Sequence, residues 1–262
     1  MRALSVAATG MQAQQTNVEV ISNNIANMNT TAFKRQRAEF QDLLYQDQRR
    51  VGSNSSAAQT IVPTGIQLGV GVKTAGVYRM NDQGTLQQTY NSLDLAIQGH
   101  GYFVIQLPNN ITGYTRAGSF QLSPTGQLVT IDGFPVQPGL TVPQNTLSVT
   151  VNAAGEVSAK IDGQVTPAVV GTLQLATFVN EAGLQSIGNN LFLDTPASGQ
   201  AQTGQAQQTG YGTIQQGFLE LSNVNPVTEI TNLITAQRAY ELNSKVINSS
   251  NEMMQTVNQL RQ

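Results

Sequence analysis

The chain has no cysteine, no tryptophan and a single histidine among its 262 residues. Without cysteine it can form no disulfide, no thiolate-ligated metal centre and no thiol nucleophile, and it is compatible with any redox compartment. Only 11% of its residues are charged, against about 25% in typical soluble proteins. Glutamine and asparagine fill much of the difference. The resulting surface is polar but weakly self-repelling, which favours a chain that packs against copies of itself.

Long apolar runs are also missing. No stretch approaches the ~18 consecutive apolar residues that a membrane-spanning helix needs. The first residues do not resemble a secretory signal, because Arg2 is followed by an interrupted pattern that contains glutamine instead of a continuous apolar core. The sequence therefore predicts a protein that stays in the cytoplasm or is exported without a cleaved signal peptide.

The charges are unevenly distributed along the chain. Residues 1–79 contain eight basic and four acidic side chains, residues 80–220 contain two and eight, and residues 221–262 contain three of each. A nucleic-acid-binding protein concentrates far more basic charge, so no nucleic-acid partner is expected. We expect the basic first segment to face an acidic neighbour in an assembly.

No catalytic constellation emerges from the sequence. The only imidazole, His100, lies in a glycine turn and is interpreted as a solvated turn residue. Asp82, Asp94, Asp132 and Asp162 could supply a carboxylate pair, but two of them belong to Asp-Gly turns. The glycine strings lack the helix and Lys-Ser/Thr of a phosphate loop. The chain is therefore predicted to be no enzyme and to have no cofactor or metal site.

Apolar side chains recur every seven residues at both ends of the chain, which is typical of helices that pack as coiled coils. Residues 1–32 and 223–262 are predicted to contain long helices that pair with each other. An ordinary surface helix can bury such a stripe on its own domain, but the terminal position and the length favour assembly. The candidate assembly interface comprises Leu4, Met11, Val18, Ile21, Ile25, Met28, Leu233, Tyr240, Ile247, Met254 and Val257.

The C-terminal helix is predicted to begin at Asn225-Pro226, because Asn is a favoured N-cap and Pro suits the first helical position. Glu229 in the first turn complements the helix dipole. In the N-terminal helix Gly10 costs about 1 kcal/mol relative to Ala. Such a helix is expected to be stable only when packed.

Between the helices the sequence predicts strands. Short apolar runs separated by Asp-Gly turns indicate an all-β outer domain over residues 73–222, so the fold class is α+β. Residues 33–72 are predicted to be an arm and long loop. Within them, residues 34–45 are a short helix or an extended arm, residues 46–65 a loop ordered only by contacts, and residues 66–72 a strand. Residues 194–217 are interpreted as a mobile connection.

Two polar signatures flank these helices, and they are similar to those of the bacterial flagellar axial proteins, the rod and hook family. Ala32 stands where that family commonly has Gly before a Phe. Further matches lie in residues 93–103 and 114–120, and nearly the whole chain is covered. The signature residues are Asn23, Asn24, Asn27, Phe33, Lys34, Asn223, Asn225, Arg238 and Tyr240.

Residues 37–45, 60–72 and 186–189 resemble the distal-rod branch of the family. The resemblance implies a structural subunit of the basal-body rod, which links the motor to the hook, and export by the flagellar type III apparatus. Implied partners are further copies, proximal rod proteins, the hook protein, and the P-ring and L-ring proteins. A hook protein or proximal rod subunit is the alternative within the family. A cell-wall-cleaving enzyme and a secreted adhesin are alternatives from other classes.

From this resemblance we expect a helical polymer in which the two terminal helices of each subunit form an inner tube with the β domain outside. Head-to-tail contacts that do not close produce such filaments. We further expect residues 46–65 to become ordered between neighbouring subunits and to stiffen the polymer.

Overall fold

The structure of the protein, a computed structural model, describes residues 2–49 and 64–260. The chain divides into two compact units. Unit 1 consists of residues 1–26, 36–78 and 225–262, and unit 2 consists of residues 27–35 and 79–224. Each unit therefore combines stretches that are far apart in the sequence.

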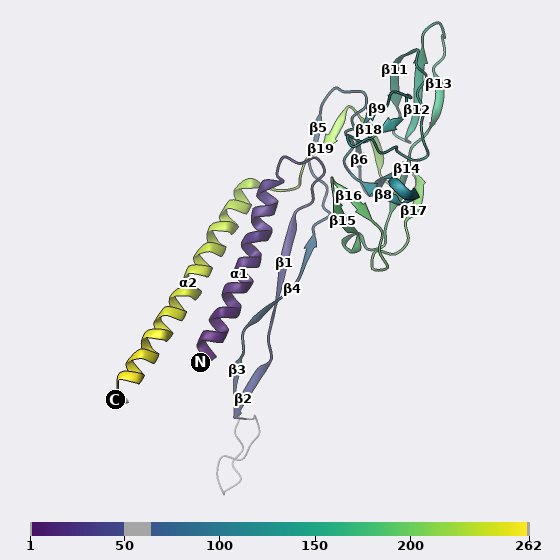
Figure 1. The fold of residues 1–262 in the computed structure, drawn as a ribbon. Helices are drawn as coiled ribbons and strands as arrows, with labels where there is room; N and C mark the ends of the chain where they lie inside the picture. The colour runs from purple at the N-terminus through teal and green to yellow at the C-terminus, as the bar shows by residue number, and fades with distance from the viewer. Residues whose placement is uncertain (1, 50–63, 261–262) are drawn as a thin grey trace. The chain divides into compact units, whose positions relative to one another are not determined.

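Two long helices dominate unit 1. The helix α1 (Arg2–Ala26) lies beside α2 (Pro226–Gln259), and the two pack against each other (Figure 1). Because α1 ends at Ala26, Met28 falls in the following turn and not on the helix. The α+β class, with paired terminal helices on either side of a strand-rich middle, is confirmed.

The start of α2 follows its sequence signals. The Asn225 side chain accepts hydrogen bonds from the backbone N–H groups of Val227 and Thr228 at 3.1 and 3.3 Å, which satisfies two donors that a helix start leaves free. Pro226 occupies the first turn, where its missing N–H removes no helical bond, and Glu229 also lies in that turn. The predicted cap and start are confirmed.

A pair of two-stranded sheets completes unit 1 and is called the arm here. In the arm β1 (Gln36–Asp42) pairs with β4 (Val72–Arg79), and β2 (Tyr45–Arg49) pairs with β3 (Ile66–Gly69). For residues 34–45 the extended alternative is correct and the helix is wrong. The single strand predicted over 66–72 is interrupted before β4, because Gly71 adopts a φ of 131° and its carbonyl accepts a hydrogen bond from Leu43 N.

The loop prediction for residues 46–65 is tested only in part. Residues 46–49 belong to β2, so the prediction is wrong there, because backbone pairing with β3 does not require apolar side chains. Residues 50–63 lie outside the described residues, so their predicted ordering on assembly stays a prediction.

Unit 2 is built almost entirely of short strands. Its largest sheet has six strands in the order β15-β16-β8-β7-β14-β17, every neighbouring pair of them antiparallel. Smaller sheets pair β11-β12-β13, β18-β6, β19-β5 and β10-β9. The strands are β5 (Leu86–Gln88), β6 (Leu95–Gln98), β7 (Tyr102–Gln106), β8 (Thr112–Thr115), β9 (Gln121–Leu122), β10 (Leu128–Val129), β11 (Thr146–Val151), β12 (Glu156–Ile161), β13 (Ala168–Thr172), β14 (Gln174–Thr177), β15 (Gln185–Gly188), β16 (Leu191–Leu193), β17 (Gln202–Gln205), β18 (Thr213–Gln216) and β19 (Phe218–Glu220).

The mobile connection predicted at residues 194–217 is wrong, because this segment contributes β17 and β18. β17 lies at the edge of the six-stranded sheet, and Ile214 is the buried side chain of β18. An edge strand pairs through its backbone and can keep most of its side chains in solvent. A segment rich in Gln, Gly and Thr can therefore form strands without showing an apolar pattern.

The core of unit 2 follows the two-residue alternation of β7. Phe103 belongs to one buried apolar cluster, and its neighbours Tyr102 and Val104 belong to another. Successive side chains of a strand point to opposite faces, so a central strand covered on both sides is apolar throughout. The ring of Phe103 meets that of Phe120 edge-on at 5.1 Å, which adds to the area that both rings bury.

Left-handed backbone marks several turns. Gly133 and Gly163 have φ values of 85° and 81°, which confirms the turns predicted at both Asp-Gly pairs. Ala32 has a φ of 57°, a conformation that disfavours a residue with a Cβ. This explains why the related sequences commonly have glycine at the position of Ala32.

Gly118 permits a close approach between two backbone segments of unit 2. A Cβ atom at this position would lie 1.5 Å from the carbonyl oxygen of Leu95. The same two residues are joined by a hydrogen bond from Leu95 N to Gly118 O at 2.9 Å. Neither segment can move away without breaking this bond.

We predict that Gly118→Ala lowers the free energy of unfolding by about 3 kcal/mol or more, because overpacking against a fixed backbone cannot relax. Gly76→Ala is the matched control, since a Cβ there would meet no atom within 4 Å. Urea titration followed by circular dichroism measures both. Equal midpoints for the two variants would contradict the assignment.

Candidate assembly interface and buried polar anchors

The two helices of unit 1 keep one register along their contact. Near one end Asn24 donates a hydrogen bond to Glu229, and 14 residues back along α1 Gly10 faces Asn243, which is 14 residues further along α2. The helices are therefore antiparallel and do not slip. The same register brings Arg2 opposite Asn251, so the last residues of α2 extend past the start of α1.

The contact between the helices is made largely by small and polar residues. A Cβ atom on Gly10 would lie 2.9 Å from the amide nitrogen of Asn243. Gly10, which lowers helix propensity, therefore provides the space into which Asn243 fits. The buried side chains are Ala7, Ala13, Val20, Ile21 and Asn24 on α1, and Glu229, Ala236 and Ser250 on α2.

The predicted interface residues are mostly not the ones that this contact buries. Ile21 is buried. Six others are half-buried: Leu4, Met11, Val18, Ile25, Leu233 and Ile247. Four are exposed: Met28, Tyr240, Met254 and Val257. Within one copy of the chain the heptad stripe is therefore left largely open, and its role in assembly stays a prediction.

Large apolar side chains are exposed along the whole of α2. Ile230 and Ile234 lie on the side of the helix away from Glu229 and Ala236, as their spacing of 100° per residue requires. Near the C-terminal end no residue of α1 is in register to cover the apolar side chains. The exposed apolar residues of α2, called the α2 stripe below, are Val227, Ile230, Ile234, Tyr240, Leu242, Val246, Met253, Met254 and Val257, with Leu260 just beyond the helix.

The arm is exposed as well. Every residue of β2 and β3 is exposed, and Leu44 between β1 and β2 is 85% accessible. An isolated two-stranded hairpin is marginally stable in water. Within unit 1 the arm therefore has little apolar burial to hold it.

Asn24 is the first buried anchor, and it joins three segments of unit 1. Its amide nitrogen donates to Gln36 O at 2.8 Å and to the Glu229 carboxylate at 3.1 Å, and its amide oxygen accepts from Gln36 N at 2.8 Å. An amide is the one side chain that can match both the donor and the acceptor of a strand residue. Asn24 thus fixes α1 against β1 and against the first turn of α2.

Glu220 is the second anchor and lies in the interior of unit 2. One carboxylate oxygen accepts from Lys34 Nζ at 2.6 Å and from Gly84 N at 2.9 Å, and the other accepts from Arg116 Nε at 2.6 Å. All three charged side chains are at most 5% exposed. The remaining donors are also paired: Lys34 reaches Asp82 O at 2.8 Å, and Arg116 reaches Gly99 O at 2.6 Å.

The charges of this cluster stabilise one another. Burial raises the pKa of the Glu220 carboxyl, but Arg116 and Lys34 outweigh burial and hold that pKa below its ordinary value of 4.5. Burial and the repulsion of Arg116 lower the pKa of the Lys34 ammonium, which Glu220 offsets only in part. Removing one member would leave an uncompensated buried charge.

Asn223 is the third anchor. Its amide nitrogen donates to Met80 O at 2.9 Å and to Asp82 O at 3.0 Å, while its oxygen accepts from Arg35 N at 2.7 Å. Phe33 supports the same contact, because its carbonyl accepts from Asn223 N at 3.4 Å. The segment 27–35 is thereby held to the rest of unit 2 by its backbone.

The other signature residues have varied positions. Asn27 accepts a hydrogen bond from the Thr30 hydroxyl in the turn after α1, and Asn225 caps α2. Asn23 on α1 and Arg238 on α2 are exposed, and Tyr240 is 43% exposed. Sequence reasoning selected Lys34 but missed Arg116 and Glu220 as its partners. Their signal was that each is a charged residue inside a nearly uncharged, signature-bearing stretch.

Over residues 2–49 and 64–260, no three His, Cys, Asp or Glu side chains come together in a way that could hold a metal ion. In the same part of the chain neither helix combines the length and apolarity that a membrane crossing requires.

We predict that Glu220→Gln lowers the free energy of unfolding by about 3–5 kcal/mol, because two buried cations lose their counter-charge. Since the Glu220 pKa is lower when folded than when unfolded, its stabilisation is complete above pH 4.5 and is lost as the pH falls through the folded pKa. The variant should therefore also lose part of the acid dependence of stability.

Glu39→Gln is the control, because Glu39 pairs with Arg37 at the exposed surface of the arm, where ion pairs contribute little. Denaturant titrations of both variants between pH 3 and 7 provide the measurement. A Glu220→Gln chain as stable as the Glu39→Gln chain at pH 7 would refute the anchor.

Comparison with known families gives three matches along the chain. "Flagella basal body rod protein" matches residues 4–34, "Flagellar hook protein FlgE/F/G D1 domain" matches 96–159, and "Flagellar basal body rod FlgEFG protein C-terminal" matches 215–260. The first contains Lys34, the second Arg116 and the third Glu220. The buried ion cluster therefore takes one member from each matched segment.

Similar curated proteins match over essentially their whole length. The "Flagellar basal-body rod protein FlgG" of Caulobacter vibrioides is 58% identical over 261 residues, with 100% of both chains covered. The protein of the same name from Agrobacterium fabrum is 51% identical, with 98% of each chain covered. That from Borreliella burgdorferi is 44% identical, with 100% of this chain and 99% of the relative covered. Full-length identity of this size, together with the three matched segments, means that the chain belongs to the flagellar basal-body rod protein family.

Proposed function

We propose that the chain is a structural subunit of the distal flagellar rod. It polymerises helically into a rigid drive shaft that transmits motor torque to the hook. The family supplies the place in the basal body, and the exposed apolar residues of α2 supply the means of assembly.

The α2 stripe is the observation that carries this proposal. A soluble monomer rarely leaves a large contiguous apolar patch in water, and such patches are typical of interaction sites. Here the intramolecular contact uses alanine, glycine, asparagine and serine, while leucine, isoleucine, valine and methionine face outward. The side chains with the most apolar area to bury are thus available to a neighbouring subunit.

The proposed polymer brings these stripes together around one axis. Non-closing contacts between identical subunits generate helical filaments, and helices that bury apolar side chains between subunits resist bending along their length. The four segments 1–32, 33–72, 73–222 and 223–262 would then act as core helix, arm, outer domain and core helix. The heptad residues named above would share in this interface, and the arm would gain the burial that it lacks in a single copy.

Further partners follow from the same position. We propose contacts with the proximal rod proteins at one end, with the hook protein at the other, and with the P-ring and L-ring proteins around the outside. The rod would cross the periplasm to the outer membrane, after export of the chain by the flagellar type III apparatus without a cleaved signal peptide. A purely structural subunit needs no catalytic activity and no cofactor for this.

We predict that Leu242→Glu blocks polymerisation without unfolding the subunit. Leu242 is 61% exposed, so the folded monomer should change in stability by no more than about 0.5 kcal/mol. A charge buried between subunits should raise the critical concentration at least tenfold. Sedimentation of polymer at a series of protein concentrations measures it.

Asn248→Glu is the matched control on the same helix, because Asn248 is exposed and its neighbours on that face are polar. It adds the same charge away from the α2 stripe. Polymerisation of the Leu242→Glu chain at the wild-type concentration would count against the proposal.

We also predict that helix content rises on polymerisation. The contact between α1 and α2 buries few large side chains, and helices depend on tertiary packing for most of their stability. Circular dichroism at 222 nm should therefore be stronger for the polymer than for the monomer at equal protein concentration. Equal signals would contradict assembly-coupled ordering of the helices.

A further inference from the structure

A polar pocket lies on unit 2, beside the edge where β8 meets β16. It has a volume of about 220 Å³ and is half open to solvent. Ligand pockets for small molecules usually occupy about 300–1,000 Å³, so this one has room for a single long side chain. Its lining consists of Thr115, Ala117, Ser119, Thr130, Ile131, Asp132, Asn189, Asn190 and Leu191.

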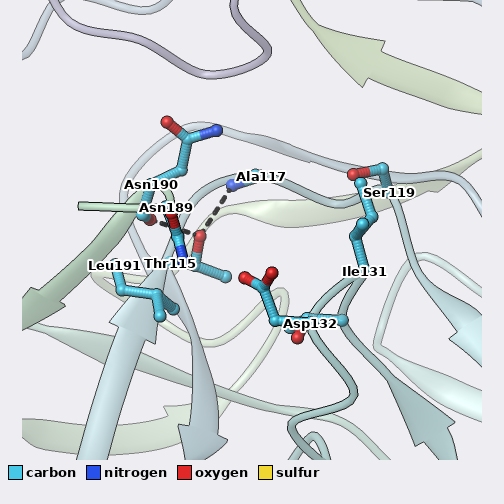
Figure 2. Close-up of a pocket in the computed structure, with 9 residues that line it drawn as sticks. Thr115, Ala117, Ser119, Ile131, Asp132, Asn189, Asn190 and Leu191 are labelled. Atoms are coloured by element: carbon cyan, nitrogen blue, oxygen red, sulfur yellow. Dashed lines mark hydrogen bonds between the residues drawn. The ribbon is translucent and has the colours of Figure 1, made fainter.

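The wall around the pocket is fixed by hydrogen bonds. The Thr115 hydroxyl donates to Asn190 O at 2.7 Å and accepts from Ala117 N at 3.2 Å (Figure 2). The Asn190 amide donates to Thr31 O at 3.2 Å. These groups hold the wall in place and are already engaged, so they do not select a ligand.

The carboxylate of Asp132 is different, because it points into the pocket (Figure 2). Among the interactions of the described residues, none involves the side chains of Asp132, Ser119 or Asn189. The pocket thus offers a carboxylate, a hydroxyl and an amide, and no cation lines it. Carboxylates pair most strongly with guanidinium and ammonium groups.

The charge balance of the two units indicates where such a group comes from. Unit 2 has eight acidic and five basic residues, and the cations of Lys34 and Arg116 are buried on Glu220. Its accessible surface is therefore strongly acidic, with seven acidic and three basic residues remaining. In unit 1, by contrast, Arg49, Lys73, Arg238 and Lys245 are exposed, and the described part of the chain offers them to a neighbour.

We infer that this pocket receives a lysine or arginine side chain from unit 1 of a second copy, with Asp132 as its counter-ion. The inference rests on the proposed polymer and adds a specific contact to it. Opposite charges arranged in this way align subunits and reject wrong registers. The apolar α2 stripe would then supply affinity, and the pocket would fix the orientation of unit 2.

The second Asp-Gly turn provides a control of the same local structure. Asp162 precedes a glycine with a φ of 81°, as Asp132 precedes one with a φ of 85°, but Asp162 does not line the pocket. Full-length Asp132→Asn should raise the critical concentration for polymerisation about tenfold, as for loss of one charged hydrogen bond. Asp162→Asn should leave it within twofold of wild type.

Site-specific photo-crosslinking identifies the occupant. Ile131 is 70% exposed at the pocket, so p-benzoylphenylalanine introduced in its place should react with whatever enters. In rods assembled from the full chain, we expect a crosslink to a peptide of a second copy that contains one of the unit 1 cations. Neutralising that cation should raise the critical concentration as much as Asp132→Asn does, and combining both changes should add nothing.

A crosslink only to a different protein, or to a peptide of this chain without a lysine or arginine, would overturn the inference. So would equal polymerisation of the Asp132→Asn and Asp162→Asn chains, while the proposed function would stand. A wild-type chain that forms no polymer under any condition would instead overturn the proposed function.

Discussion

Burying Glu220 between Lys34 and Arg116 requires all three residues to be in place together, because a charge removed from water without its partner is strongly destabilising. These residues are separated in sequence by 82 and 104 positions, and each lies in a different matched segment of the family. The cluster therefore makes unit 2 cooperative. Residues 27–35 join it by way of Lys34, and Asn223 fastens the same segment to the backbone at Met80 and Asp82.

The terminal helices obey the opposite logic. Their mutual contact is built on small side chains and on the amide of Asn24, and it leaves most large apolar residues of α2 outside. Such a pair has a defined register but little buried apolar area, so it gains from further packing. A rigid unit 2 joined to a helix pair that is incomplete in one copy is a suitable design for a subunit that is delivered singly and stabilised by its neighbours.

Sequence reasoning succeeded where a local rule decides the outcome. The cap at Asn225, the first-turn proline, the Asp-Gly turns and the alternating strands around β7 all depend on residues that are close together. It failed at residues 194–217, where β17 and β18 pair through their backbone without an apolar pattern, and at residues 46–49 of β2. It also recognised Lys34 as part of a signature without its partners, since neither Arg116 nor Glu220 is near it in sequence.

The sequence by itself determined that two long helices flank a strand-rich middle and that the chain belongs with the axial proteins of the flagellum. Periodicity and signatures are properties of short segments, and they can be followed along the chain. Only the tertiary structure decided which face of α2 meets α1, why Gly10 stands opposite Asn243, and that one buried carboxylate joins three distant segments. Those outcomes depend on which surfaces exclude water together, and no single segment contains that information.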